Sequence, residues 1–222
     1  MFNNKKIASI FIALFSLVWL TGAGWLPLAV SNAVATTTWN PADKAAGITL
    51  SGGNLTAASA SGSMVAVRTV SSYSTGKFYS SSVTTSSNNL VAMSICNATY
   101  SLTTSPLATL NCIGVALTSG NVFLNSGGIC TGAAINVGDV LDVAVDLSAK
   151  RHWYRINGGV WFGNGGASPN PATGVNGCDI SGIAAGPYYT TVGQATGGAT
   201  SITSNFGATA YTNAAPAGFG NW

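Results

Sequence analysis

An alternation of apolar and polar side chains with a period of two constrains this fold more than any other feature of the sequence. Residues 141–147 show it best, since Leu, Val, Val and Leu alternate there with Asp, Ala and Asp. Successive side chains of a strand point to opposite faces, so this segment is predicted to be a strand with one dry and one wet face. From Thr36 onward no stretch shows a convincing helical period. The chain is therefore predicted to be all-β.

Turn residues divide the remaining sequence into short strands. Met64–Thr69 alternates in the same way, and Asn157-Gly158 separates His152–Ile156 from Gly159–Phe162, which is the strongest short-range signal for a hairpin. The other β-prone runs are Ile48–Leu50, Leu90–Cys96, Cys112–Leu117, Tyr188–Val192 and Thr200–Phe206. About a dozen short strands punctuated by Gly, Ser and Asn indicate a sandwich or a barrel. Residues 163–177 form the one long loop, of a length that is often functional or mobile.

Composition supports a folded domain with an uncharged surface. Hydrophobic residues make up 47% of the chain, so its low content of charged residues, 6%, does not indicate disorder. Ser, Thr, Asn and 28 Gly supply the polarity instead. No internal repeat and no linker divides residues 36–222, which are therefore expected to form one domain.

The first 35 residues have the pattern of an export signal. A short basic segment, Met1–Lys6, precedes an apolar run, Ile7–Leu20, and Ala33-Val34-Ala35 offers small residues for cleavage, so residues 1–35 are predicted to be a signal peptide and Thr36 the mature start. Alternatively, Ile7–Val30 is long enough to cross a bilayer as an uncleaved anchor helix, and only then is a membrane a partner. Both interpretations place the domain outside the cytoplasm, secreted or at the cell surface or in the periplasm.

Charge argues against nucleic acid as a partner. The formal net charge of +3 includes Lys5 and Lys6, and without them six basic residues face five Asp, which leaves +1. Such a domain has no strongly positive surface that would attract nucleic acid.

Four cysteines, Cys96, Cys112, Cys130 and Cys178, follow the predicted cleavage point. An even number in an exported chain indicates up to two disulfides, with three possible pairings. The alternative is that they are buried free thiols, which behave as small hydrophobic residues. The sequence has no CxxC pair and a single His, so no structural zinc site is expected.

The residues needed for hydrolysis are missing from the sequence. Glycan hydrolysis uses paired carboxylates, commonly Glu, and the chain contains no Glu. Asp142 and Asp146 share a strand face but lie about 13 Å apart, while Asp139 is expected to cap a turn and Asp146 to accept hydrogen bonds. His152, the single His, has no G-x-S-x-G elbow to partner it. No catalytic residue, metal site or cofactor is therefore expected, and the chain is predicted not to be an enzyme.

The order of short motifs along the chain resembles the SPRY (B30.2-like) family. The resemblance runs from about Thr38 to Trp222, and the motifs are Trp39–Asp43, Gly76–Tyr79, Asn111–Val115, Gly138–Leu147, Trp153–Trp161, Pro187–Tyr189, Asn205–Gly207 and Pro216–Phe219. Two positions depart from the family pattern: Tyr79 is followed by Ser rather than Glu, and Asp142 stands where Gly is frequent. The resemblance implies a concanavalin-like sandwich of two antiparallel sheets. It also implies recognition of a protein or peptide through loops at one end.

Four aromatic residues are candidates for ligand binding. Tyr73 lies in a loop that resembles one used by some SPRY domains to bind short peptides. Trp161 and Phe162 stand at the entry to the long loop, and Tyr188 begins a predicted strand with Tyr189, so one of the two tyrosines is expected to pack inward. Aromatic side chains on rigid loops suit binding because they bury a large area with few rotamers to freeze. The competing interpretation is that aromatics such as Trp161 fill the core, as expected for Trp153 and Phe206.

Three functions remain open at this point. The first is an exported, non-catalytic module that binds a protein or peptide ligand. The second is a lectin-like module that binds glycans, which exposed aromatics beside Asn and Asp would suit. The third is a structural or decorating component of a surface assembly or a phage-derived particle.

Overall fold

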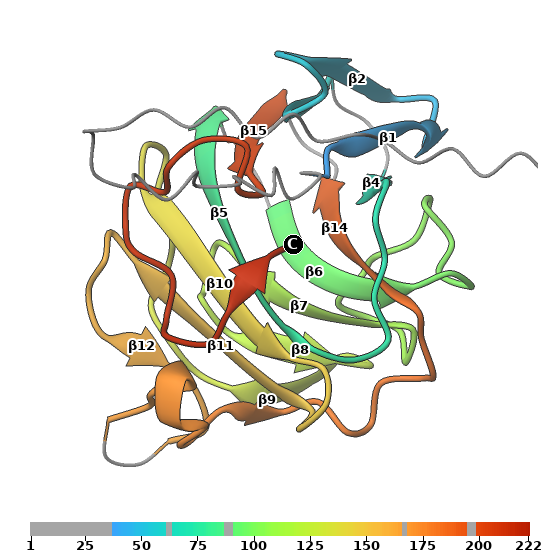
Figure 1. Cartoon of the computed structure of the whole chain (residues 1–222). Coiled ribbons are helices and arrows are strands. Elements are labelled where there is room, and N and C mark those ends of the chain that lie inside the picture. The colour runs from blue at the N-terminus through green and yellow to red at the C-terminus, as the bar shows by residue number, and fades with distance from the viewer. Residues whose placement is uncertain (1–36, 61–63, 87–90, 166–167, 195–198) are drawn as a thin grey trace, which may run out of the picture. The chain divides into compact units, whose positions relative to one another are not determined.

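The computed structural model describes residues 37–60, 64–86, 91–165, 168–194 and 199–222, and these residues form two packed β-sheets (Figure 1). The predicted signal peptide or anchor, residues 1–35, lies outside the described residues. Within the described part of the chain no helix has the length and apolarity needed to cross a bilayer. The prediction of an all-β fold is confirmed for the described residues, since their one helical element is a single 3-10 turn at Pro171–Thr173.

The first sheet contains seven strands among the described residues, in the order β1-β4-β14-β6-β7-β8-β9, and all its pairs are antiparallel. Its strands are β1 (Trp39–Lys44), β4 (Val65–Thr69), β6 (Val91–Asn97), β7 (Cys112–Ala116), β8 (Val122–Leu124), β9 (Gly127–Cys130) and β14 (Tyr188–Gln194).

The second sheet contains nine strands among the described residues. Seven follow the order β12-β11-β10-β5-β15-β3-β2, while β13 pairs with β11 and β16 runs parallel to β5. Its strands are β2 (Ile48–Ser51), β3 (Thr56–Ser59), β5 (Lys77–Ser86), β10 (Val140–Asp146), β11 (Arg151–Ile156), β12 (Trp161–Phe162), β13 (Cys178–Asp179), β15 (Thr200–Asn205) and β16 (Gly220–Asn221).

The main core lies between the two sheets. Alternate residues of β10, namely Leu141, Val143 and Val145, face Met93 and Ile95 of β6 across it. Period-two strands from both sheets thus turn one face each toward this core, which is how the alternation in the sequence becomes a sandwich. The predicted hairpin is also confirmed: Asn157 and Gly158 have φ values of 51° and 69°, as a type I′ turn requires.

The outer face of β10 is buried, contrary to the wet face that the alternation predicted. Asp142 and Ala144 are 0% exposed. The C-terminal residues 211–219 cover this face, where Tyr211 and Phe219 pack against a second cluster of Tyr79, Ala144 and Trp153. A carboxylate can be buried there because Asp142 pairs with Arg155 at 2.9 Å and accepts a hydrogen bond from Asn213 at 2.9 Å.

Two disulfides form, which rules out the free-thiol alternative. Cys96–Cys112 links directly opposed residues of β6 and β7. Cys130–Cys178 joins β9 of the seven-stranded sheet to β13 of the nine-stranded sheet and so ties the two layers together. Two disulfides indicate folding in an oxidising environment.

Candidate ligand-binding surface

Four loops meet at one end of the sandwich, and we call them the loop surface: residues 70–76, 98–111, 147–150 and 180–187. Hydrogen bonds connect each loop to another. Gly76 accepts from the amide of Leu147 at 2.8 Å, the amide of Ile180 donates to Lys150 at 3.1 Å, and the amide of Ala184 donates to Leu110 at 2.8 Å. Loops fastened to one another in this way hold their side chains in fixed positions.

Tyr73 and Tyr188, far apart in the sequence, lie together at this end. They form an isolated antiparallel bridge in which each amide donates to the other carbonyl, at 2.9 and 2.8 Å. The Tyr73 ring is half-buried, stacks on Phe78 at 4.0 Å and meets Trp222 edge-on at 5.6 Å. Tyr73 thus offers a ligand one edge of an aromatic ring whose position is fixed by packing.

Tyr188 presents little surface, since it is only 2% exposed. Its ring belongs to the main core, and its hydroxyl accepts a hydrogen bond from the ammonium of Lys150 at 3.0 Å. Of the adjacent pair, Tyr188 is therefore the tyrosine that packs inward, while Tyr189 is half-buried on the other face. Tyr188 contributes to the loop surface by holding Lys150 in place.

Trp161 and Phe162 lie on β12, at the edge of the nine-stranded sheet, whereas Tyr73 bridges to β14 of the seven-stranded sheet. The Trp161 ring packs on the second cluster under the guanidinium of Arg155, which is 4.5 Å from the ring centroid. Phe162 points to the opposite face and stacks on Tyr154 at 4.9 Å. Both rings are half-buried, so the four candidate residues do not form one site: Tyr73 and Tyr188 come together, and the other two do not join them.

Several exposed residues of the loop surface were missing from the sequence-based candidates. Val70 and Leu110 are more than half exposed, and Ser74 and Thr75 flank Tyr73 on the exposed tip of its loop. The sequence contained a signal for Ser74 and Thr75, because Ser-Thr-Gly after Tyr73 is typical of a turn. Nothing local distinguishes Val70 or Leu110 from core residues.

The loop surface contains one charged residue, Lys150, whose ammonium donates to the Tyr188 hydroxyl at 3.0 Å, and the charged residues next to these loops are paired. Lys77 lies 3.5 Å from Asp146, and Arg151 lies 2.9 Å from Asp179. Hydrogen bonds from Ser181 and the nearby Arg151 hold the pKa of Asp179 below its usual value. The surface therefore combines exposed aliphatic and hydroxyl groups with a fixed aromatic edge, and its one charge is the ammonium of Lys150.

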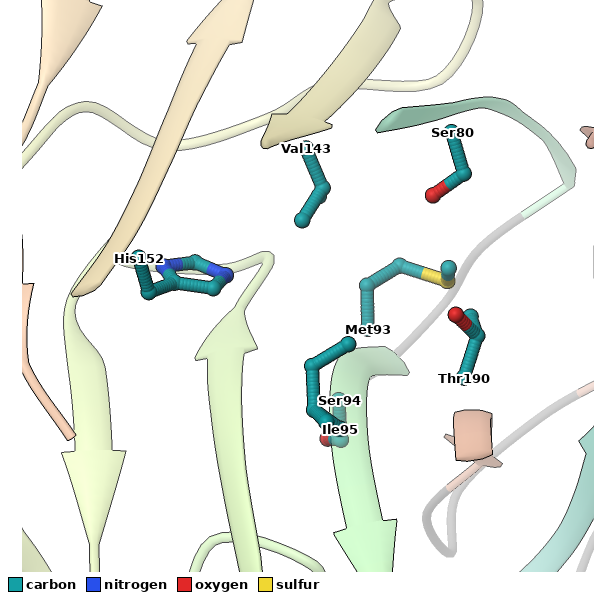
Figure 2. Close-up of a pocket in the computed structure, with 7 residues that line it drawn as sticks. All are labelled: Ser80, Met93, Ser94, Ile95, Val143, His152 and Thr190. Atoms are coloured by element: carbon teal, nitrogen blue, oxygen red, sulfur yellow. The ribbon is translucent and has the colours of Figure 1, made fainter. Parts of the chain in front are cut away.

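A small cavity lined by buried residues between the two sheets is too small for a substrate. Figure 2 shows His152, Ser80, Met93 and Thr190 around it. Its volume is about 10 Å³, room for about one water molecule. His152 is 1% exposed, and burial lowers the pKa of its imidazole to about 4, so it is neutral near pH 7 and has no contact with solutes.

The aspartates have the structural roles expected from the sequence. Asp139 accepts hydrogen bonds from Asn136 and Asn157, which lower its pKa, and Asp146 accepts from the amide of Ala149 at 2.8 Å. In the described part of the chain, no three His, Cys, Asp or Glu side chains are grouped so that they could hold a metal ion.

Comparison with known proteins gives matches in structure alone. No protein-family model and no curated protein matches the sequence. The SPRY domain of human HERC1 aligns with a TM-score of 0.59 at 12% identity, over 75% of this chain and 96% of that domain. A second human SPRY domain aligns with a TM-score of 0.51 at 15% identity, over 74% of this chain and 98% of the other. The PSpry domain of TRIM65 aligns with a TM-score of 0.54 at 14% identity, over 77% of this chain and 92% of that domain.

These similarities agree with the strand order and with the motifs that first suggested the family. At such low identity they concern the architecture alone. The described part of this chain therefore has the fold of a SPRY domain.

Proposed function

We propose that this chain is an exported, non-catalytic module that recognises a protein or peptide ligand through its loop surface. The observation that carries the proposal is the fixed edge of Tyr73 among exposed residues of hydrogen-bonded loops. A pre-organised aromatic side chain suits recognition because little conformational freedom is lost on binding. Low net charge fits a ligand held by shape and apolar contact rather than by long-range attraction.

The proposal of export rests on two independent features. The first is the basic and apolar pattern of residues 1–35, with its small-residue cleavage motif. The second is the presence of two disulfides, which persist outside the reducing cytoplasm. A glycan ligand at the loop surface is a weaker candidate, because the one half-buried ring of these loops, Tyr73, already has one face covered by Phe78.

A peptide library displayed on phage and selected on the immobilised full chain tests the proposal. Peptides selected on the wild type are then measured against two matched variants, Thr75→Arg on the loop surface and Thr118→Arg in the exposed turn after β7, at the opposite end of the sandwich. Neither substitution removes a buried side chain. We expect Thr75→Arg to raise Kd at least tenfold and Thr118→Arg to leave it unchanged.

Two results would contradict the proposal. Failure to enrich any peptide above background would argue against recognition of peptides. Equal effects of the two Arg substitutions would show that binding, although real, does not use the loop surface.

A further inference from the structure

A polar groove lies on the outer face of the nine-stranded sheet, beside the part that the C-terminal segment covers. Its floor is formed by β5 and β15, which present Ser81, Val83, Thr203 and Asn205 outward. Leu55 and the residues Thr209 and Thr212 form its sides. The volume is about 200 Å³, which is below the usual range for sites that take drug-sized molecules.

The lining of the groove is uncharged. Its outward side chains are hydroxyls, one amide and two aliphatic groups. The carboxylate of Asp142, opposite Ser81 in the neighbouring strand, is fully buried and paired with Arg155, so it adds no free charge. A charged ligand would lose hydration here without gaining a counter-charge, which disfavours ions and phosphates.

The groove is fixed by hydrogen bonds. The Asn205 amide donates to the carbonyls of Thr209 and Ala210, at 3.1 and 3.2 Å, and accepts from Gly207 at 2.9 Å, so it holds the adjacent segment in place. Thr203 is hydrogen-bonded to Thr56 at 2.8 Å. In contrast, the hydroxyls of Ser81, Thr209 and Thr212 take no part in the hydrogen bonds among the described residues. Thr209 and Thr212 are exposed and open to a ligand, while Ser81, 6% exposed, lies on the floor of the groove.

We propose that this groove binds a neutral, hydroxyl-rich ligand, namely a single sugar unit of an uncharged glycan. A sugar ring presents hydroxyls that both donate and accept, which match the Ser and Thr hydroxyls. It also presents C–H faces, which match Leu55 and Val83. This activity would be separate from the loop surface, because the groove lies on a sheet face and shares no residue with the four loops.

Titration of the ¹⁵N-labelled full chain with defined oligosaccharides tests the proposal. The neutral panel contains oligomers of glucose, mannose, galactose and N-acetylglucosamine, and one sulfated oligosaccharide serves as the charged comparison. We expect a neutral member to shift the amide signals of Ser81, Thr203 and Asn205. The double variant Ser81→Ala/Thr212→Ala should raise its Kd at least tenfold. Thr49→Ala, an exposed Thr on β2 of the same sheet outside the groove, is the matched control and should not change it.

Three results would overturn the inference: no shift with any neutral member, shifts confined to the loop surface, or preference for the sulfated member. Thr75→Arg separates this test from that of the proposed function, because it should raise the Kd for peptides at least tenfold and leave the Kd for saccharides unchanged.

Discussion

His152 is the residue whose surroundings differ most from those that its side chain would have in water. It is completely buried, and the groups around its cavity, Ser80, Met93, Ile95, Val143 and Thr190, include no titratable side chain. Desolvation alone therefore keeps the imidazole neutral in the folded state. The cost of that burial should become measurable in acid.

We expect stability to fall as the pH drops from about 6.5 to about 4. The pKa of His152 is 6.5 unfolded and about 4 folded, so in this window the unfolded chain binds a proton that the folded chain does not. The loss amounts to about 3 kcal/mol and levels off below the folded pKa. Folding also lowers the pKa values of Asp139 and Asp179. Their protonation destabilises the folded protein only below about pH 3.8, which is outside this window.

Urea unfolding of the wild type and His152→Gln between pH 4 and 7.5 measures the effect. The variant should lack this component of the pH dependence. Parallel curves for the two proteins would show that His152 is not the group responsible.

Tyr73 combines packing with exposure, and substitutions can separate the two. Truncation to Ala removes the stack on Phe78 and the edge contact with Trp222, and should lower the free energy of unfolding by about 1–3 kcal/mol. Tyr73→Phe keeps the ring and should leave the Tm within about a degree or two of wild type. Thermal unfolding of both variants checks this, and an unchanged Tm for Tyr73→Ala would mean that the ring does not pack as described.

At the scale of elements, the C-terminal segment acts as a cover for the outer face of β10. Besides its contacts with Asp142, it receives hydrogen bonds from Arg155 at the carbonyl of Ala214 and from Tyr79 at the carbonyl of Asn213. Burial raises the pKa of Tyr79 and of Tyr211 above the ordinary value, so both hydroxyls stay protonated. Hydrogen bonds from polar groups thus hold the segment on the sheet, and apolar packing of Tyr211 and Phe219 adds to its stability.

Asp142→Ala should destabilise the protein strongly. Arg155, only 13% exposed in its side chain, would keep its charge with no carboxylate beside it, which typically costs about 3–5 kcal/mol. Asp139→Ala removes a half-buried carboxylate that accepts hydrogen bonds in a turn and serves as the control, with an expected loss of about 1 kcal/mol. Chemical denaturation measures both, and similar losses would contradict a special role for the buried pair.

The two disulfides should contribute unequally. Cys130–Cys178 spans 48 residues and Cys96–Cys112 spans 16, so the chain-entropy estimate gives about 4 and about 3 kcal/mol. Double Cys→Ser variants of each pair, compared by denaturant unfolding, test the order. A larger loss for the shorter bridge would indicate that local strain or residual structure, rather than loop closure, determines the contribution.

The elements that the sequence predicted are those with a strong local signal. Residues 141–147 alternate over their whole length, and Asn157-Gly158 has the conformation that its turn type needs. The pattern of apolar and polar residues did not predict the long central strand β5. Its residues Ser80–Ser82 and Thr84 are polar on both faces, so they show no alternation. One of its buried hydroxyls is matched across the sheet, in the hydrogen bond of 2.7 Å between Ser82 and Ser204, while that of Thr84 has no hydrogen-bond partner among the described residues.

The candidate site was predicted only in part, for a physical reason. Tyr73 was identified from a resemblance in its loop, but its pairing with Tyr188 depends on how two distant strands meet. The burial of Asp142 likewise depends on a segment that follows it by some seventy residues in the chain. A period of two shows which residues share a face, and leaves open what covers that face.

At the scale of the whole molecule, the start of the fold bears on the export prediction. Trp39 in β1 is 0% exposed, and Thr37, the second residue after the predicted cleavage point, accepts a hydrogen bond from the amide of Ser71 at 2.9 Å, so the fold holds the chain close to that point. A peptidase needs an extended segment in its active site, which the folded β1 would hinder. Cleavage should therefore precede folding of the domain.

We expect protein recovered from the medium or periplasm to begin at Thr36, with a net charge of +1 in place of +3. N-terminal sequencing of the exported protein measures this directly. Ala35→Arg, which replaces the small residue before the cut, should block cleavage and leave the uncut chain in the membrane fraction. Ala45→Ser, a small change beyond the start of β1, should not alter processing. Full-length wild type in the membrane fraction would instead identify Ile7–Val30 as an anchor, with the domain still on the outer side.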